Sequence, residues 1–186
     1  MLVLVFSLQV FTKAADIKDF EMEGMSIGDS LLDFFEESEI KKNFFYKNKK
    51  YFAFSSIKYS SENYNGFQFH AKNNDKRYII ASIEGIKTFE NNFDECLKYK
   101  DRIVKDILKD LGNLKVKTDE GKHDYDTTGK SLYYRTSIML NPKAKYFNLQ
   151  VSCTDWSKEL EKRFSDKLKV SISTDVFADY MNNEAY

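Results

Sequence analysis

Proline is nearly absent from this sequence, with one in 186 residues, and glycine, histidine and tryptophan are scarce at seven, two and one. Because no stretch is rich in Pro, Gly or Ser, nothing marks a linker between domains. Acidic and basic residues balance at 29 each. Proteins that bind nucleic acid commonly carry a surplus of Lys and Arg facing the phosphates, so no nucleic-acid partner is expected.

Motifs for catalysis and cofactor binding are also missing. The chain shows no Ser-His-Asp arrangement, no Gly-rich nucleotide fingerprint and no zinc-ligand spacing. A catalytic thiol would need a nearby histidine, and His70 and His123 are expected on a solvent-facing strand position and in a loop. We therefore assign no catalytic, cofactor-binding or metal-binding residue and expect no cofactor. The sequence favours a non-enzymatic protein; the alternative is an enzyme with a site assembled from distant residues.

Residues 124–131 end like a phosphate-binding loop, but two features argue against that interpretation. Asp124 replaces the first glycine of the motif and would repel phosphate, and a strand rather than a helix is expected after the segment. The segment also resembles a calcium loop in its order of Asp124, Asp126 and Thr128. Arg135 stands where that loop needs a bidentate acid.

Two interpretations of this acidic segment stay open. The first is a solvated loop, which we favour. The second is a weak metal site of another kind, which would add Asp119, Glu120 and His123.

Aromatic residues are plentiful, with 16 Phe and 12 Tyr. Residues 44–52 interleave them with lysines, as in a base-stacking surface. The alternative is the codon bias of an AT-rich genome, which enriches Phe, Tyr, Lys, Asn and Ile together, and the balanced charge favours it. Exposed Tyr51, Tyr59 and Tyr133 opposite the core would support a binding role, whereas a deep pocket with perturbed acids or His70 would support catalysis.

The amino terminus carries an uncharged apolar run over residues 2–11. It is too short to span a bilayer but has the length of a signal-peptide core, and Thr12 and Ala14 are small residues before a cleavage site at Ala15. The alternative is a first strand or helix of the fold. We predict a signal peptide over residues 1–14 and a single domain over residues 15–186. The mature protein is then periplasmic or secreted and is not an integral membrane protein.

Hydrophobic periodicity predicts an α+β fold. Helices are expected over residues 27–35, 92–111 and 155–164 and after Thr174, and the second of these has the clearest apolar face. Three strands are expected within residues 51–84, a hairpin over residues 132–140 and 146–154, and a last strand over residues 168–173. The segment before residue 132 is expected to be a polar loop. Because hairpins dominate, we predict a largely antiparallel sheet of about six strands with the helices packed on one face.

The two cysteines are both expected to face the core. Cys96 falls on the apolar face of the central helix, and Cys153 falls on the apolar face of its strand. In an exported protein such a pair is a candidate disulfide. Two buried free thiols are the alternative.

Residues 20–33 (FEMEGMSIGDSLLD) resemble the opening of uncharacterised small exported bacterial proteins of the periplasm. More loosely, Gly24-Met25-Ser26 before a short helix is similar to small lipoproteins with the β-lactamase-inhibitor-protein-like fold. The likeness covers about the first forty mature residues, and this chain lacks the lipidated cysteine and adds a long helix. It implies a protein partner in the cell envelope and transfers no site residues.

We therefore expect an exported non-enzymatic protein that binds a macromolecule or a small ligand in the cell envelope. A small periplasmic hydrolase is the alternative.

Overall fold

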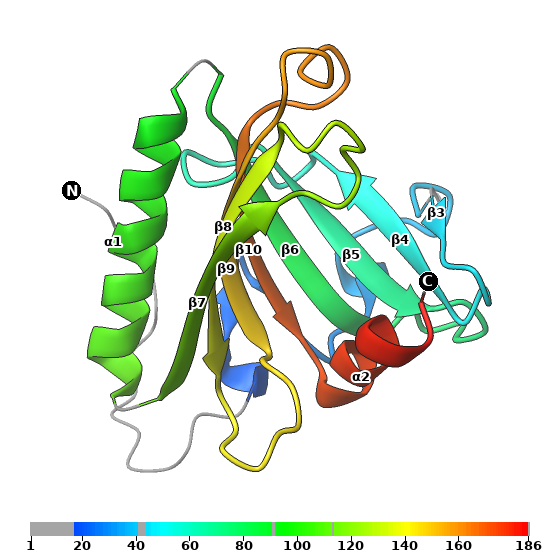
Figure 1. The fold of residues 1–186 in the computed structure, drawn as a ribbon. Helices are drawn as coiled ribbons and strands as arrows, with labels where there is room; N and C mark the ends of the chain where they lie inside the picture. The colour runs from blue at the N-terminus through cyan, green and yellow to red at the C-terminus, as the bar shows by residue number, and fades with distance from the viewer. Residues whose placement is uncertain (1–16, 41–43, 91, 113, 186) are drawn as a thin grey trace.

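The computed structural model describes residues 17–40, 44–90, 92–112 and 114–185. An antiparallel sheet of eight strands dominates it, in the order β3-β4-β5-β6-β10-β9-β8-β7 (Figure 1). The strands are β3 (Phe44–Phe45), β4 (Tyr51–Ser56), β5 (Gly66–Lys72), β6 (Ile80–Thr88), β7 (Lys115–Lys122), β8 (Leu132–Met139), β9 (Leu149–Asp155) and β10 (Lys167–Ser173). The class is α+β, as predicted, with β3 and β7 added at the two edges. The predicted signal peptide lies outside the described residues.

Strand β7 is the main element that the sequence did not predict. The strand lies at the sheet edge, where most of its side chains are exposed, so its sequence needs no alternation of apolar and polar residues. Without that alternation the segment is predicted as a polar loop. Lysines at both ends and in its middle are typical of an edge strand that avoids pairing with other chains.

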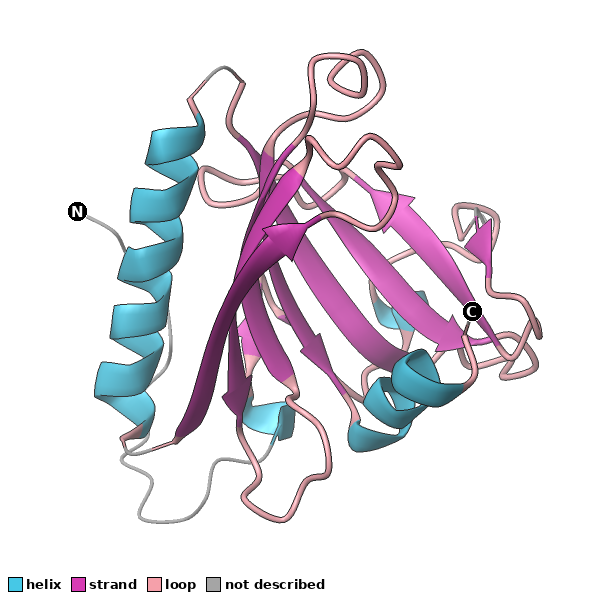
Figure 2. Cartoon of the chain, in the orientation of Figure 1, coloured by secondary structure: helices cyan, strands magenta, loops and turns pink. Residues whose placement is uncertain are grey.

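The two α-helices lie on opposite faces of the sheet (Figure 2), which corrects the prediction that the helices share one face. Helix α1 (Phe93–Leu111) packs on β9 and β10. Helix α2 (Asp175–Asn183) covers the other face near β4 and β5, where Phe177 contacts the rings of Tyr51 and His70. The sheet therefore has a core face under α1 and a second face that α2 covers only in part.

Helix α1 follows the predicted boundaries closely. The side chain of Asn92 caps its start by accepting from the N–H of Glu95, and Gly112 follows its last residue with a φ of 77°. Its buried positions are Cys96, Lys100, Ile103 and Ile107, spaced by three or four residues. Lys100 is buried within this stripe because its Nζ reaches Asp101 Oδ1 at 2.8 Å.

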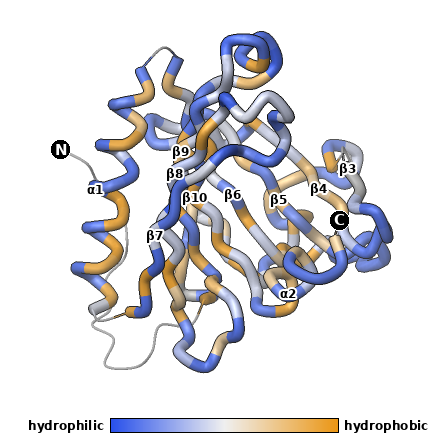
Figure 3. Tube along the Cα trace, viewed as in Figure 1, coloured by the Kyte–Doolittle hydropathy of each residue, from blue (hydrophilic) through white to orange (hydrophobic). Residues whose placement is uncertain are grey.

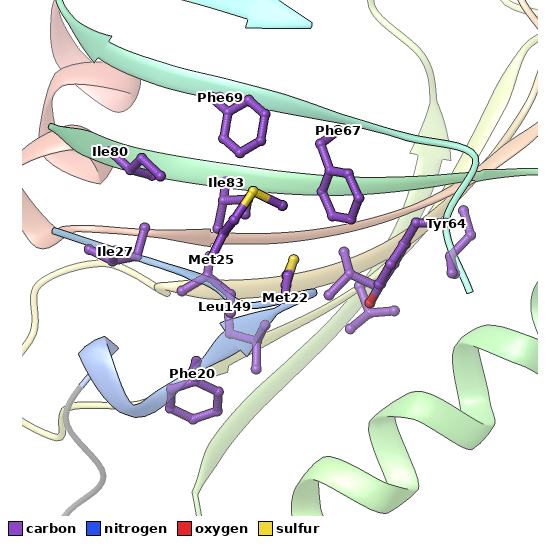
Figure 4. Packing of buried hydrophobic residues seen from close by; sticks show 14 of the residues in the cluster. Phe20, Met22, Met25, Ile27, Tyr64, Phe67, Phe69, Ile80, Ile83 and Leu149 are labelled. Atoms are coloured by element: carbon purple, nitrogen blue, oxygen red, sulfur yellow. The ribbon is translucent and has the colours of Figure 1, made fainter. Parts of the chain in front are cut away.

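The amino-terminal segment completes the core face, but not as the predicted helix. It forms a small hairpin of β1 (Glu21–Met22) and β2 (Met25–Ser26), flanked by the 3₁₀ turns η1 (Ile17–Asp19) and η2 (Leu31–Asp33). The N–H of Gly28 donates to the carbonyl of Ile80, the first residue of β6. This tertiary bond replaces the local bond that a helix would need. Figure 4 shows Met22, Met25 and Ile27 packed beneath the side chains of β5 and β6.

The predicted helix over residues 155–164 is also absent. Residue 155 ends β9, and the segment that follows consists of turns. The carboxylate of Asp166 accepts from the N–H of Trp156 at 2.8 Å, and the Trp156 side chain is 6% exposed. This hydrogen bond joins the first residue after β9 to the last residue before β10, so the β9–β10 connection is a closed loop.

Strands alternate apolar and polar residues, as the hydropathy colouring shows (Figure 3). In β10, Leu168, Val170 and Ile172 are buried in the core, and the residues between them are half-buried on the other face. The core face is thus apolar across the sheet. The opposite face carries the polar residues of the central strands, with a separate aromatic cluster under α2 at one end.

Candidate functional site: the open face of the sheet

We call the polar side of the central strands, where α2 does not cover it, the open face. Strand register places its members in rows across neighbouring strands. Arg135, Ser152 and Lys169 form one row on β8, β9 and β10, and Tyr133, Thr154 and Lys167 form the next. A third row consists of Ser137, Gln150, Ser171 and Glu84.

Helix α2 closes one end of the open face. Thr174 caps the helix by accepting from the N–H of Phe177, as the sequence predicts. An aromatic cluster of Tyr46, Tyr51, Phe177 and Tyr180 then forms between α2 and strands β3 to β5. Tyr51 is 1% exposed, so it belongs to this buried cluster and is not the exposed binding aromatic that we considered.

Two loops close the opposite end. The β9–β10 loop contributes Trp156 and Phe164, whose rings stack at 4.7 Å. The β7–β8 loop contributes His123, whose ring lies 4.4 Å from that of Trp156. Figure 1 shows both loops at the end of the sheet away from α2. A polar strip of the central strands therefore lies between two aromatic ends.

Asp126 organises the β7–β8 loop. One carboxylate oxygen accepts from the N–H and the hydroxyl of Thr128, and the other accepts from the same two groups of Ser131. These hydrogen bonds, led by the Ser131 hydroxyl, hold the pKa of Asp126 well below its usual range. Both oxygens are thus used by the loop itself.

The metal-site alternative gains no support from this loop. Among the described residues, no group of three or more His, Cys, Asp or Glu side chains could hold a metal ion. Asp119 instead binds Arg135, which donates from Nε to Oδ1 at 3.1 Å and also from Nη2 to Oδ2. The Arg135 hydrogen bond is the main cause of the lowered pKa of Asp119, and burial opposes it.

A chain of polar contacts runs from Tyr46, beneath α2, onto the open face. The hydroxyl of Tyr46 lies 3.0 Å from Nδ1 of His70, and Nε2 of His70 lies 3.7 Å from Oε1 of Glu84. Lys169 Nζ binds the same Glu84 oxygen at 3.2 Å. Burial by itself raises the pKa of Glu84, but Lys169 and His70 outweigh it and hold that pKa at about 2.

Lys167 differs from the other charged residues of the open face. Glu84, Lys169 and Arg135 each have an ion-pair partner, whereas Lys167 has none among the described residues. Its side chain makes a cation–π contact with Trp156, with Nζ 5.9 Å from the centroid of the ring. Burial lowers the pKa of Lys167, the neighbouring Lys169 lowers it further, and Glu84 opposes both.

The small residues between these charges have unused hydrogen-bonding groups. Ser152 and Thr154 on β9 and Ser171 on β10 are half-buried. Their hydroxyls make no hydrogen bond to another residue that the structure describes. Such groups are free to bind water or a ligand.

The disulfide between Cys96 and Cys153 is confirmed. The two Cα atoms are 6.1 Å apart, and both residues are fully buried in the core face. The bridge joins α1 to β9 and so fixes the strand whose other side carries Ser152 and Thr154. Its role here is structural because neither sulfur is exposed.

The histidines and tyrosines named from the sequence have mixed outcomes. His70 is 3% exposed, so the prediction of a solvent-facing position is wrong, because α2 covers it. His123 is in a loop, as predicted. Tyr59 donates its hydroxyl to the carbonyl of Phe34, and Tyr133 lies half-buried on the open face.

Sequence reasoning missed Glu84, Lys167, Lys169 and Trp156. The lysines alternate with apolar residues on the last predicted strand, which marks them as facing away from the core. The sequence of the strand gave no sign that α2 and the two loops would cover this face at its two ends.

Comparisons with known proteins add no identity. No family model matches the chain, and neither the curated proteins nor the solved structures contain a match. The candidate site therefore rests on the residues of this chain alone. No helix among the described residues has the length and apolar character needed to cross a bilayer.

Proposed function

We propose that this chain is an exported, non-enzymatic binding protein that takes a small ligand or a macromolecule on the open face of its sheet, in the periplasm or outside the cell. The observation that carries the proposal is the set of unused polar groups on the central strands. Ser152, Thr154, Ser171 and Lys167 are half-buried between aromatic ends, yet none makes a side-chain hydrogen bond or ion pair with another described residue. A ligand would satisfy these groups.

The alternative of a small hydrolase finds less support in the geometry. Tyr46, His70 and Glu84 have the order of a hydroxyl, a base and an acid, which is an arrangement that activates a nucleophile. However, Tyr46 is 5% exposed and His70 is 3% exposed, because both lie beneath α2. A substrate would have to displace the helix to reach them.

Export rests on the amino-terminal apolar run together with the buried disulfide. Disulfides persist in oxidising compartments and are rare in the cytosol. Mass spectrometry of the protein from its native source tests this part. We expect a mature chain that begins at Ala15 and a mass lower by two hydrogens for the bridge. An intact Met1 would contradict export.

Nuclear magnetic resonance tests the binding site. ¹⁵N-labelled protein is screened against mixtures of small neutral, anionic and cationic compounds. We expect saturable amide shifts at Ser152, Thr154 and Ser171, while amides on the exposed side of α1 stay unchanged. Shifts that saturate only elsewhere would contradict the open face as the binding site. Turnover of ester, peptide or phosphodiester substrates that Glu84→Gln abolishes would favour the hydrolase instead.

A further inference from the structure

If the proposed binding function holds, the charged residues of the open face favour one class of ligand. Its two carboxylates are already engaged, Glu84 by Lys169 and Asp119 by Arg135. Lys167 is half-buried, and its ammonium has no carboxylate within ion-pair distance among the described residues. The acid that acts on its charge, Glu84, is already paired with Lys169. A cation removed from water without a counter-charge is unfavourable, and an anion beside it would offset the cost.

The surroundings of Lys167 suit a small oxyanion. Thr154 is its register partner on β9, and Tyr133 on β8 is the register partner of Thr154. Ser152 lies two residues before Thr154 on the same face. Strand spacing of about 4.8 Å separates β8 from β10 by about 10 Å, and in these two rows the side chains of β9 between them are the short ones of Ser152 and Thr154.

The hydroxyl groups near Lys167 can donate hydrogen bonds to an oxyanion. Hydroxyl groups of Ser and Thr donate hydrogen bonds to carboxylate or phosphate oxygens. The guanidinium of Arg135 lies over the Tyr133 ring, 5.1 Å from its centroid, and its charge is balanced by Asp119. Lys167 is therefore the cation that an oxyanion would pair with. His123 is in contact with Trp156 at the loop end. Burial is the main cause of its lowered pKa, Lys167 and Lys169 lower that pKa further, and Asp124 and Asp126 oppose them.

We propose that the open face binds a small oxyanion, a carboxylate or phosphate group, between β8 and β10. Lys167 holds the charge, and the hydroxyls of Thr154 and Ser152 donate hydrogen bonds to the oxygens. The engaged carboxylates of Glu84 and Asp119 are held away from the ligand by their own partners. The site is on the sheet itself, and the Cys96–Cys153 bridge joins its strand β9 to helix α1.

Titrations of ¹⁵N-labelled protein with acetate, methyl phosphate and neutral methyl acetate test the proposal. We expect saturable shifts at the amides of Ser152, Thr154 and Lys167 with one or both anions and none with methyl acetate. The two anions distinguish a carboxylate ligand from a phosphate ligand. Sodium chloride at matched ionic strength controls for screening.

Variants then assign the charge. Lys167→Gln should weaken anion binding by about tenfold or more, the usual effect of losing a charged hydrogen bond. Lys167→Arg should retain most of it. Lys143→Gln, at an exposed lysine of the β8–β9 turn, is the matched control and should leave binding unchanged. A spectrum that is unchanged away from β10 shows that each variant is folded.

Several results would overturn the proposal. These are shifts that chloride reproduces, anion binding that Lys167→Gln leaves intact, or no saturable shift with either anion. If neutral compounds alone shift the open face, the oxyanion assignment fails and the proposed binding function stands. If no probe of any charge shifts the open face, both fail together.

Discussion

Removing the disulfide tests the architecture that supports the open face. The bridge closes a loop between residues separated by 57 positions. For a loop of this length the entropy lost by the unfolded chain is about 14 cal/mol/K, which corresponds to about 4 kcal/mol at about 25 °C. Cys96→Ala combined with Cys153→Ala should lower the free energy of unfolding by about this amount. Because domains of ordinary size are stable by about 5–15 kcal/mol, the loss is severe.

Urea denaturation followed by circular dichroism measures the effect. Three samples are compared: the oxidised protein, the reduced protein and the double alanine variant. The reduced protein loses only the cross-link, whereas the variant also loses both buried sulfur atoms. We expect the reduced protein to account for most of the loss and to show a larger m-value, since its unfolded chain exposes more surface.

The reasoning would be refuted by a small effect of reduction. If the oxidised and reduced proteins differ by less than about 1 kcal/mol at equal m-value, the bridge does not restrict the unfolded chain as the loop length requires. If only the alanine variant is destabilised, packing of the sulfur atoms in the core stabilises the protein more than the cross-link does.

Three further predictions concern single residues. A Cβ atom on Gly85 would lie 2.6 Å from the ring of Tyr64, so Gly85→Ala should destabilise the protein by about 1–3 kcal/mol in urea titrations. Glu84 has a folded-state pKa of about 2 against an ordinary 4.5, so its contribution of about 3 kcal/mol is present above pH 4.5 and is lost as pH falls toward about 2. Acid titrations of stability should show this loss, and Glu84→Gln should remove it. Asp126→Asn should speed amide hydrogen exchange at Ser131, because the substituted side chain carries no charge to hold the loop hydrogen bonds.

Each of these has a control. Tyr64→Leu in the Gly85→Ala background should restore part of the stability, and no recovery would show that the ring contact is not the cause. An acid profile that Glu84→Gln leaves unchanged would mean that other carboxylates dominate. Exchange at Ser131 that matches the parent protein would show that Asp126 does not organise the loop.

The elements predicted correctly are those whose pattern depends on one interface. Helix α1 has a single apolar stripe, with Asn92 and Gly112 at its ends, and both local chemistry and packing agree on its limits. Strands β5, β9 and β10 alternate because one side faces the core. The elements predicted wrongly are those where long-range contacts replace local ones. The segment before η2 bonds to β6, and the loop after Trp156 is held by Asp166.

The candidate site was less accessible to prediction than the fold. Alternation showed that Lys167 and Lys169 face away from the core, but it could not show that Lys169 meets Glu84 from a strand 85 residues earlier. Nor could it show that Lys167 lacks such a partner. Pairing depends on which strands become neighbours, and β6 meets β10 only after α1 and three strands have intervened.

Local patterning alone thus determined the α+β class, the long helix, the hairpins and the inward direction of Cys96 and Cys153, because each follows from side-chain periodicity within a short segment. Only the tertiary structure decided that the helices lie on opposite faces and that His70 is buried. It also decided that one polar strip stays open between two aromatic ends. These outcomes depend on contacts between segments far apart in the chain, and short-range periodicity carries no information about them.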